Sequence, residues 1–206
     1  MQPETEKRLM EMLEREELFD LVRRERFARD QGRFDVMREC FHDDAYVRTS
    51  WYDGKGGAAY VDSSREFMKK VRGGKHWVFP AFARINGDRA TVESPAMIFN
   101  RAKLHDVTVD FHVFCRFFSR CVREDGRWKI LSFEVLFERD VMSALNPRDG
   151  LPIDWDKLES FRPSYCFLSY LQGSRGITVN QNLLGDDRPE DLAAFHEGEE
   201  AWLASM

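Results

Sequence analysis

A histidine at the start of an apolar segment is the side chain of this sequence that is best suited to move protons. The stretch reads GGKHWVFPAF, with His76 after two glycines and a lysine and before Trp77 and Val78. An imidazole titrates near neutrality and therefore serves as a general acid or base. The same ring could instead be a buried histidine bonded to backbone. The local pattern leaves both interpretations open.

A carboxylate occupies a position where helical spacing predicts an apolar side chain. Apolar residues recur at this spacing from Leu18 to Ala28, and Glu25 falls in the middle of their stripe. Burial raises the pKa of an unpaired carboxyl group, which would suit Glu25 to acid–base work. An ion pair with a neighbouring arginine is the alternative, and the sequence does not separate the two.

Charged and aromatic side chains alternate along residues 106–122. Asp110, His112 and Arg116 share one face of this segment. They could polarise a hydroxyl or carbonyl group of a substrate. We favour an ion-pair network at a subunit interface, because surface charge pairs are common and individually weak.

Further candidates for a binding site precede that segment. Trp51 and Tyr52 could line an aromatic-binding pocket, although core packing is the simpler interpretation for most aromatic residues. Asn100 and Arg101 end a strand, where one of them could reach a pocket rim. The five histidines show no H-x-H or H-E-x-x-H pattern, so we expect no metal site.

Composition sets the class of protein. The chain has 206 residues, 43% of them hydrophobic, and 17 are phenylalanine, which predicts a sizeable aromatic core. The net charge of −5 argues against a nucleic-acid partner and against a polybasic membrane anchor. No apolar run reaches the roughly 18 residues of a membrane span. The charged N-terminus does not resemble a signal peptide, and we expect a cytoplasmic protein with reduced cysteines.

The remaining pattern predicts how these residues are positioned. Helices are expected at residues 4–31, 33–41 and 61–71, with a strand at 43–54. The turns NGD and REDGR then join two pairs of antiparallel strands, at residues 76–85, 89–99, 106–122 and 127–138. Helices on one side of a curved antiparallel sheet make an α+β fold that can leave a pocket at its open end. Residues 1–140 form the predicted domain, and residues 141–206 form an extension packed on it.

Three stretches carry a resemblance to a known family. They are FARDQGRFDVMRECFHDDAYV, KHWVFPAFARINGDRATVES and REDGRWKILSFEVLFERD, and they cover most of residues 15–140. They resemble the polyketide cyclase-like (SnoaL-like) branch of the nuclear transport factor 2-like superfamily. This branch includes scytalone dehydratase, bile-acid dehydratase, ketosteroid isomerase and diarylpropane lyases. The resemblance implies a cone-shaped sheet around the first helix and catalysis without a metal or cofactor.

The resemblance also assigns roles to individual positions. Asp30 and His76 match the acid and the catalytic histidine of the dehydratases, and His76 would point into the cone with Trp77 on the opposite side of its strand. Glu25 or Arg29 stands where the dehydratases have a tyrosine beside the acid. Three residues fall near a second dehydratase tyrosine, namely Thr49, Tyr46 and Tyr52. Asn100 falls near a second histidine of scytalone dehydratase.

These observations lead to a functional expectation. The protein would be a cofactor-independent lyase for a small apolar, aromatic substrate, and it would eliminate water or release formaldehyde. An isomerase of the ketosteroid type and a non-catalytic ligand- or protein-binding module are the alternatives. A homo-oligomer, dimer or trimer, is expected because Phe114 and Phe118 lie on the outer face of the sheet.

Overall fold

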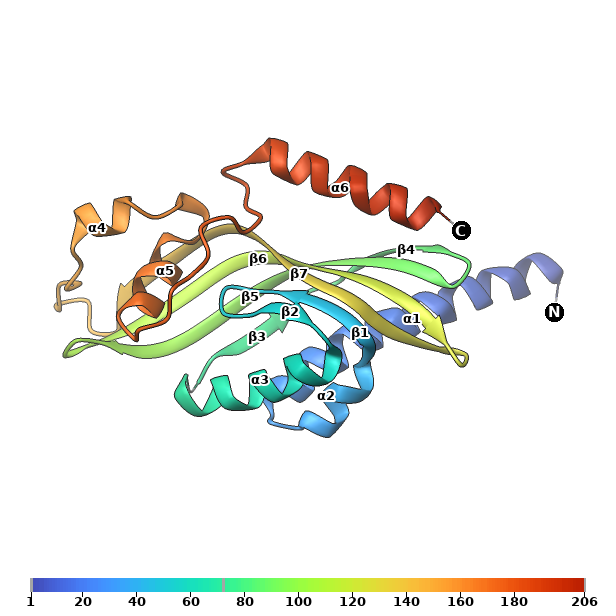
Figure 1. Cartoon of the computed structure of the whole chain (residues 1–206), viewed down its shortest axis with the longest axis horizontal. Helices are drawn as coiled ribbons and strands as arrows, with labels where there is room; N and C mark the ends of the chain where they lie inside the picture. Colours follow the sequence, from blue (N-terminus) through green and yellow to red (C-terminus); the bar gives the residue numbers. More distant parts are fainter. Residues whose placement is uncertain (1, 72, 206) are drawn as a thin grey trace.

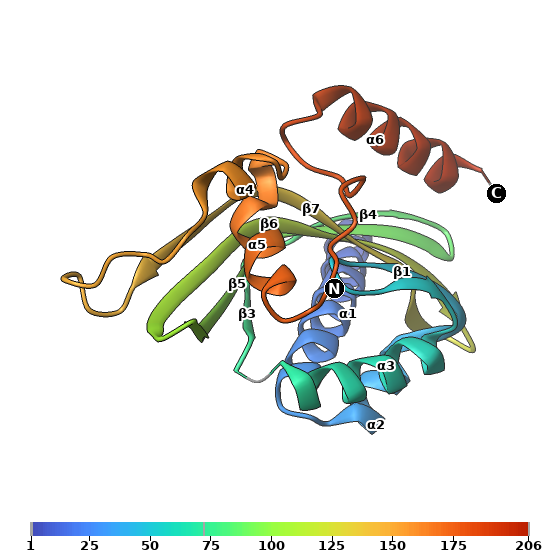
Figure 2. The ribbon, with the colours of Figure 1, turned by 60° about the vertical axis from the view of Figure 1, so that its left-hand side comes forward.

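One curved sheet organises the molecule, with helices on both of its faces (Figures 1 and 2). The structure is a computed structural model that describes residues 2–71 and 73–205. Helices α1 to α3 lie on the concave side of the sheet, and α6 lies across the opposite side. The sheet does not close into a barrel, and the predicted α+β architecture around a long first helix is confirmed.

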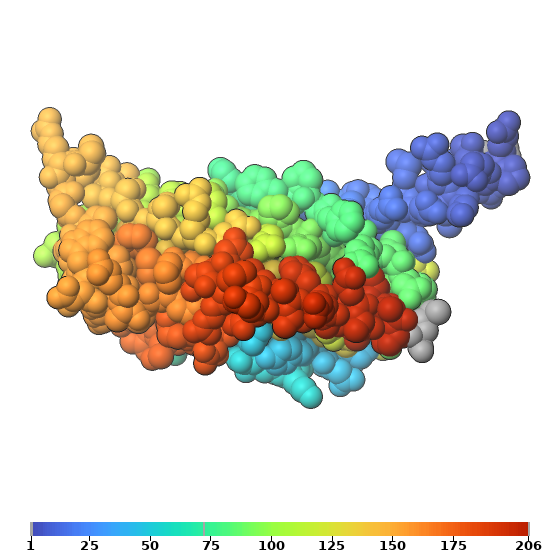
Figure 3. All heavy atoms as spheres, turned by 90° about the horizontal axis from the view of Figure 1, so that it is seen from above, coloured from blue at the N-terminus to red at the C-terminus, as the bar shows by residue number. Residues whose placement is uncertain are grey.

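The first helix runs the length of the concave side. Helix α1 spans Pro3–Asp30, close to the predicted 4–31, and ends where Gly32 takes a positive φ of 70°. Its second half buries Leu18 and Leu21, whereas its first half projects beyond the sheet (Figure 3). Among the described residues, no helix combines the length and the apolar character needed to cross a membrane.

Two shorter helices follow the first. Helix α2 spans Phe34–Cys40 and α3 spans Gly57–Lys70, both near the predicted positions. Gly57 permits the close packing of α3 against the first strand, since a Cβ atom there would lie 2.5 Å from the carbonyl oxygen of His42. In this packing the ring centre of Tyr60 in α3 lies 5.3 Å from that of Phe41, the first residue of the first strand.

Within residues 2–71 and 73–205, the sheet has seven strands in the order β2-β1-β7-β6-β5-β3, with β4 pairing separately with β5. Strand β1 is parallel to β7 and the other pairs are antiparallel. Their bounds are β1 Phe41–Arg48, β2 Asp53–Lys55, β3 Lys75–Val78, β4 Phe82–Asn86, β5 Arg89–Leu104, β6 Val107–Glu124 and β7 Arg127–Ala144.

Two predicted strands proved to be pairs of short ones. The segment 43–54 contains β1 and β2, which pair as a hairpin. The segment 76–85 is divided around Pro80 into β3 and β4, which both pair with β5. Proline has no N–H to donate to the sheet, so the strand is interrupted there. The predicted NGD and REDGR turns are confirmed, with positive φ at Gly87 and Gly126.

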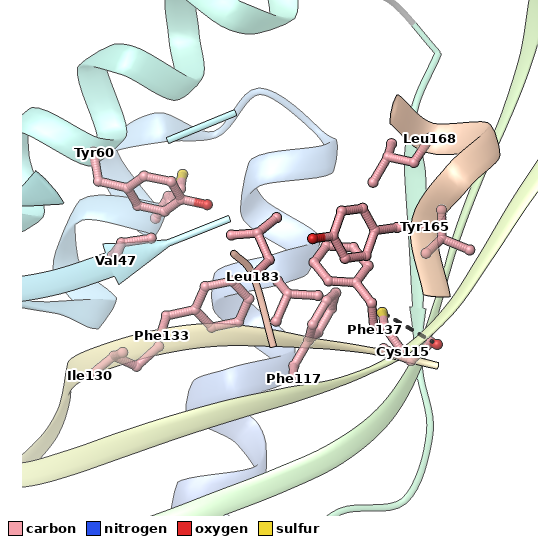
Figure 4. Packing of buried hydrophobic residues seen from close by; sticks show 14 of the residues in the cluster. Val47, Tyr60, Cys115, Phe117, Ile130, Phe133, Phe137, Tyr165, Leu168 and Leu183 are labelled. Carbon is pink, nitrogen blue, oxygen red and sulfur yellow. Dashed lines mark hydrogen bonds between the residues drawn. The ribbon is translucent and has the colours of Figure 1, made fainter. Parts of the chain in front are cut away.

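The core lies between α1 and the concave face. Alternate residues of β6 point into it, and Val109, Val113 and Cys115 are no more than 1% exposed. Aromatic rings of separate elements meet there, with Phe117 and Phe133 centred 5.2 Å apart and Phe137 and Tyr165 4.9 Å apart (Figure 4). Such pairs add to the stabilisation that comes from burial alone.

The C-terminal extension passes from one face of the sheet to the other. Helices α4 (Trp155–Glu159) and α5 (Cys166–Gly173), and the 3-10 turn Pro163–Tyr165 between them, follow β7. The chain then crosses the edge of β7, where Leu184 accepts a backbone hydrogen bond from Phe137. Helix α6 (Pro189–Ala204) covers the outer face beyond this crossing.

Helix α6 covers part of the outer face, where Phe114 and Phe118 had suggested a contact between subunits. Phe118 is only 5% exposed, because its ring lies 5.0 Å from that of Phe195 in α6. Phe114 lies under the guanidinium of Arg139, 4.2 Å from its ring centre. The apolar residues that had suggested a subunit contact are therefore covered from within the same chain, and they no longer support an oligomer.

Candidate active site

A cavity of about 230 Å³ lies between the end of α1, α3, the sheet and α5. Its apolar wall consists of aromatic and aliphatic side chains, namely Trp51, Phe67, Met68, Val71, Ile98, Phe111, Leu168 and Leu171. Its polar side chains are few, namely Arg29, Ser50, Lys75, His76, Asn100, Gln172 and Arg175. A concave, mostly apolar space with a few polar groups is typical of small-molecule sites.

His76 and Asp30 are in direct contact at the wall of this cavity. The Nδ1 atom of His76 lies 2.7 Å from Oδ1 of Asp30, and its backbone N–H donates to Oδ2 at 2.7 Å. The two side chains are 8% and 7% exposed. Asp30 is the last residue of α1, and His76 is the second residue of β3. Trp77 is turned outward and is 56% exposed, on the side of the strand that the resemblance implied.

The charges around the pair favour a neutral ring beside an ionised carboxylate. Burial lowers the pKa of His76 to about 4, the hydrogen bond to Asp30 opposes this shift, and Arg26 and Arg29 reinforce it. Burial tends to raise the pKa of Asp30, but the hydrogen bonds from His76 and the charge of Arg26 outweigh it and leave the pKa lowered. Nδ1 therefore donates to the carboxylate, and Nε2 is the nitrogen that can accept a proton from a bound molecule.

Glu25 lies deeper in the core than this pair. Its Oε2 atom is 3.0 Å from Nη2 of Arg26, and both side chains are at most 5% exposed. The Arg26 guanidinium also lies 5.0 Å from the ring centre of Phe117 and 4.7 Å from that of Phe133. Burial raises the pKa of the Glu25 carboxyl group above its ordinary value, and the charges of Arg26 and Arg29 only partly offset this effect. Glu25 does not line the cavity, and its contact is the arginine pair that the sequence had left as the alternative.

Arg29 was not among the residues that we expected to contact a ligand. Its side chain is 6% exposed, lines the cavity and lies over Trp51, with the guanidinium carbon 5.5 Å from the ring centre. Nη1 is 3.6 Å from Oδ1 of Asp30, and Nε has no hydrogen-bond partner within residues 2–71 and 73–205. Two signals in the sequence pointed to Arg29, namely its place beside Asp30 and the resemblance, which sets Glu25 or Arg29 where the dehydratases have a tyrosine.

The structure brings two of the predicted binding residues to the cavity. Trp51 forms part of its wall and stacks on Phe67 with ring centres 4.3 Å apart. Asn100 lies on β5 and is 9% exposed, and its Oδ1 atom has no hydrogen-bond partner among the residues that the structure describes. Both side chains could therefore touch a bound molecule.

Three other predicted binding residues make contacts within the β1–β2 hairpin and its turn. The hydroxyl group of Tyr46 donates to Asp53 at 2.7 Å. The Thr49 hydroxyl accepts backbone hydrogen bonds from Trp51 and Tyr52, which holds the turn that presents Trp51. Tyr52 packs on Trp51 from behind, with ring centres 5.8 Å apart. None of the three predicted residues lines the cavity.

The charged residues of β5 and β6 also lie away from the cavity. Arg101 and Asp110 form a two-bond ion pair at 2.7 and 2.8 Å. Arg116 pairs with three carboxylates on the outer face, namely those of Glu93, Glu138 and Asp186. His112 is half-buried opposite Phe99 and Val141 in the sheet. Arg101, Asp110 and Arg116 therefore form ion pairs, as we favoured from the sequence. Their partners lie in the same chain and not in a second subunit.

Part of the cavity wall comes from the C-terminal extension. Leu168, Leu171 and Gln172 on α5 and Arg175 after it face the other lining residues. The side chain of Gln172 donates to Ser50 at 3.3 Å, which connects α5 to the segment before Trp51. The apolar run SYCFLSYLQG was the only sequence signal for this wall, and it did not indicate which face of the sheet it would cover.

Comparison with known proteins identifies the family. The SnoaL-like domain matches residues 10–134, which is more than half of the chain. The chain belongs to the SnoaL-like domain family. The resemblance noted in the sequence is thereby confirmed.

One sequence relative and two solved structures show how similar the chain is to individual proteins. The chain is 30% identical over 199 residues to pea pathogenicity protein 2 of Fusarium vanettenii, covering 93% of this chain and 84% of that protein. The structure of a LinA-type3 hexachlorocyclohexane dehydrochlorinase from Novosphingobium barchaimii superposes with a TM-score of 0.57 and 15% identity, covering 70% and 99% of the two chains. A putative scytalone dehydratase from Novosphingobium aromaticivorans gives a TM-score of 0.50 and 22% identity, covering 73% and 97%. These two structures show the same fold.

Proposed function

We propose that this protein is a cofactor-independent lyase that removes a small leaving group from an aromatic substrate. The observation that carries the proposal is the 2.7 Å contact between His76 and Asp30 at the wall of an apolar cavity. A histidine whose second nitrogen is held by a carboxylate has a defined tautomer and a partner for its charged form. The dehydrochlorinase and the putative dehydratase support the idea only as an analogy at the level of the fold.

The chemistry follows from the placement of these groups. Nε2 of His76 accepts a proton from a substrate carbon, and the C–H electron pair becomes a new double bond as the bond to the leaving oxygen breaks. The imidazolium then returns its proton to the leaving hydroxyl, which departs as water. Asp30 offsets the positive charge of the ring during this step. The apolar wall, with Trp51 and Phe67 in it, keeps bulk water away from the reacting atoms.

The cavity volume restricts the size of the substrate. A cavity of about 150 Å³ is enough to hold benzene, and this one has about 230 Å³. A molecule of one or two fused rings matches this space better than two aryl rings joined by a three-carbon chain. The volume therefore favours loss of water over release of formaldehyde from a diarylpropane.

Turnover of a substrate panel tests the proposal. One- and two-ring aromatic diols and hydroxyketones would be incubated with the protein, and the products would be identified by mass spectrometry. We expect a product lighter by one water, and we expect His76→Ala to lower kcat by about a hundredfold or more. The circular dichroism spectrum of the His76→Ala variant should match that of the wild type, which would show that the variant is folded.

A matched control and the opposing outcomes make this test decisive. His112→Ala removes a histidine from the outer face and should leave kcat unchanged. A product of unchanged mass would indicate an isomerase instead. Full activity in folded His76→Ala, or no turnover of the panel by the wild type, would contradict the lyase proposal and favour a ligand-binding module.

A further inference from the structure

The cavity is cationic although the chain as a whole is acidic. The net charge is −5, yet the ionised side chains lining the cavity are Arg29, Lys75 and Arg175. Among the described residues, no aspartate or glutamate lines it. Asp30 lies just behind the wall, but both of its carboxylate oxygens already accept hydrogen bonds from His76. The cavity therefore presents positive charge to any molecule that enters it.

Arg29 differs from the other buried arginines of the described chain. Arg26 has the carboxylate of Glu25 at 3.0 Å, although its own Nε and Nη2 atoms have no hydrogen-bond partner among the described residues, and Arg162 forms two bonds to Asp187 at 2.6 and 2.8 Å. Arg29 is as buried as they are, at 5% exposure. Its carboxylate contact is the 3.6 Å approach to an oxygen that His76 already occupies.

A buried guanidinium is costly unless hydrogen bonds and opposite charge compensate it. The Nε atom of Arg29 has no partner in the part of the chain that the structure describes. A carboxylate in the cavity would supply both the charge and a planar pair of acceptors that matches the guanidinium fork. The remaining lining is aromatic and aliphatic, with Trp51 and Phe111 on its walls, and suits a ring.

We propose that the ligand of this cavity is a small aromatic carboxylate, with its carboxylate bound by Arg29 and its ring held between the apolar walls. Arg175 and Lys75 at the same cavity add positive charge that attracts such an anion. This inference deepens the proposed function, because it assigns a substrate class to the same site. It concerns binding and can be tested apart from turnover.

A bound anion would also affect the histidine. Negative charge near an imidazole stabilises its protonated form and raises its pKa. His76 lines the same cavity as Arg29, so a carboxylate there would make the ring a stronger base in the complex than in the free protein. The proposed substrate would thus prepare the base for proton transfer.

Isothermal titration calorimetry with 2-naphthoate and its neutral isostere 2-naphthamide tests the inference on the full chain. We expect the wild type to bind the acid about tenfold more tightly than the amide or better, the range of one charge-assisted hydrogen-bonded pair. Arg29→Gln should remove this preference, and Arg8→Gln, on the exposed first half of α1, should retain it. Raising the salt concentration should weaken binding of the acid and not of the amide.

The outcomes separate this inference from the lyase proposal. His76→Ala should still prefer the acid, whether or not the wild type turns over any substrate. Equal affinity for 2-naphthoate and 2-naphthamide would overturn the inference. So would a panel of one- and two-ring aromatic acids in which no acid binds more tightly than its own amide. This comparison needs only the wild type, so it decides the question even where Arg29→Gln fails to fold.

Discussion

Nδ1 of His76 lies 2.7 Å from Oδ1 of Asp30, although 46 positions separate the two residues in the chain. The contact joins the C-terminal end of α1 to the edge strand β3. A second bond, from the backbone N–H of His76 to Oδ2, fixes the strand as well as the ring. The carboxylate therefore sets both the tautomer of the histidine and its position at the cavity.

Replacing the acid should inactivate the protein without removing the base. We expect Asp30→Asn to lower kcat by about 10²–10⁴-fold, because an amide neither offsets the imidazolium charge nor enforces the tautomer. Nitrogen NMR of His76 should show a changed tautomer population in this variant. Asp110→Asn, on the exposed Arg101 pair, is the matched control and should retain activity. Activity within about threefold of the wild type in folded Asp30→Asn would remove the carboxylate from the mechanism.

The pH dependence of catalysis should reflect the lowered pKa of the histidine. The base must be neutral to accept a proton, so kcat/KM should rise as the pH increases through the pKa of about 4 and then level off. A rise centred near the ordinary value of about 6.5 would instead indicate an unperturbed or different group. With an aromatic carboxylate as substrate, the rise in kcat should lie at higher pH than the rise in kcat/KM, because the bound anion favours the imidazolium.

The same shift should appear in stability. The pKa of His76 is lower in the folded chain than in the unfolded one, so its contribution to stability is present above the unfolded value of about 6.5 and is lost as the pH falls toward 4. The lowered pKa of Asp30 acts in the same direction at still lower pH. Urea unfolding at pH 7 and pH 5 should show a decrease in the free energy of unfolding. The decrease should be smaller in His76→Gln, and an equal decrease in both proteins would assign the effect to other groups.

The attachment of the C-terminal extension should depend on one buried ion pair. Arg162 is 8% exposed, and Asp187 holds its guanidinium with two hydrogen bonds while also accepting one from Ser164. We expect Asp187→Asn to lower the free energy of unfolding by about 3–5 kcal/mol, because it leaves a buried charge without its partner. Asp110→Asn breaks an exposed pair and should change stability little.

Limited proteolysis would show which part of the chain is loosened in the Asp187→Asn variant. Cleavage of folded Asp187→Asn should occur first in the segment after β7, since the pair holds the crossing of the extension at the sheet edge. Because α5 forms one wall of the cavity, the same variant should bind 2-naphthoate more weakly. Unchanged stability and protease resistance would show that the backbone bonds at Phe137 suffice to hold the extension.

Local pattern predicted the elements whose formation depends on near neighbours. The spacing of Leu18 and Leu21 placed α1, and the turns at Gly87 and Gly126 placed two hairpins, because helix faces and tight turns are specified within a few residues. The break at Pro80 was overlooked because several of the residues around it, Trp77, Val78, Phe79 and Phe82, favour strands. The family resemblance, rather than spacing, joined Asp30 to His76.

The tertiary structure decided which charges meet the cavity and which meet one another. Sequence alone showed that Glu25 falls within the apolar stripe of the first helix and that Arg116 stands among aromatic residues. It did not show that Glu25 pairs with a buried arginine, that Arg116 holds the extension, or that Arg29 faces the cavity. These outcomes depend on contacts between segments far apart in the chain, and on α5 closing a wall that no local periodicity assigns to either face of the sheet. The residue types were determined by the sequence, and their electrostatic partners were determined by the fold.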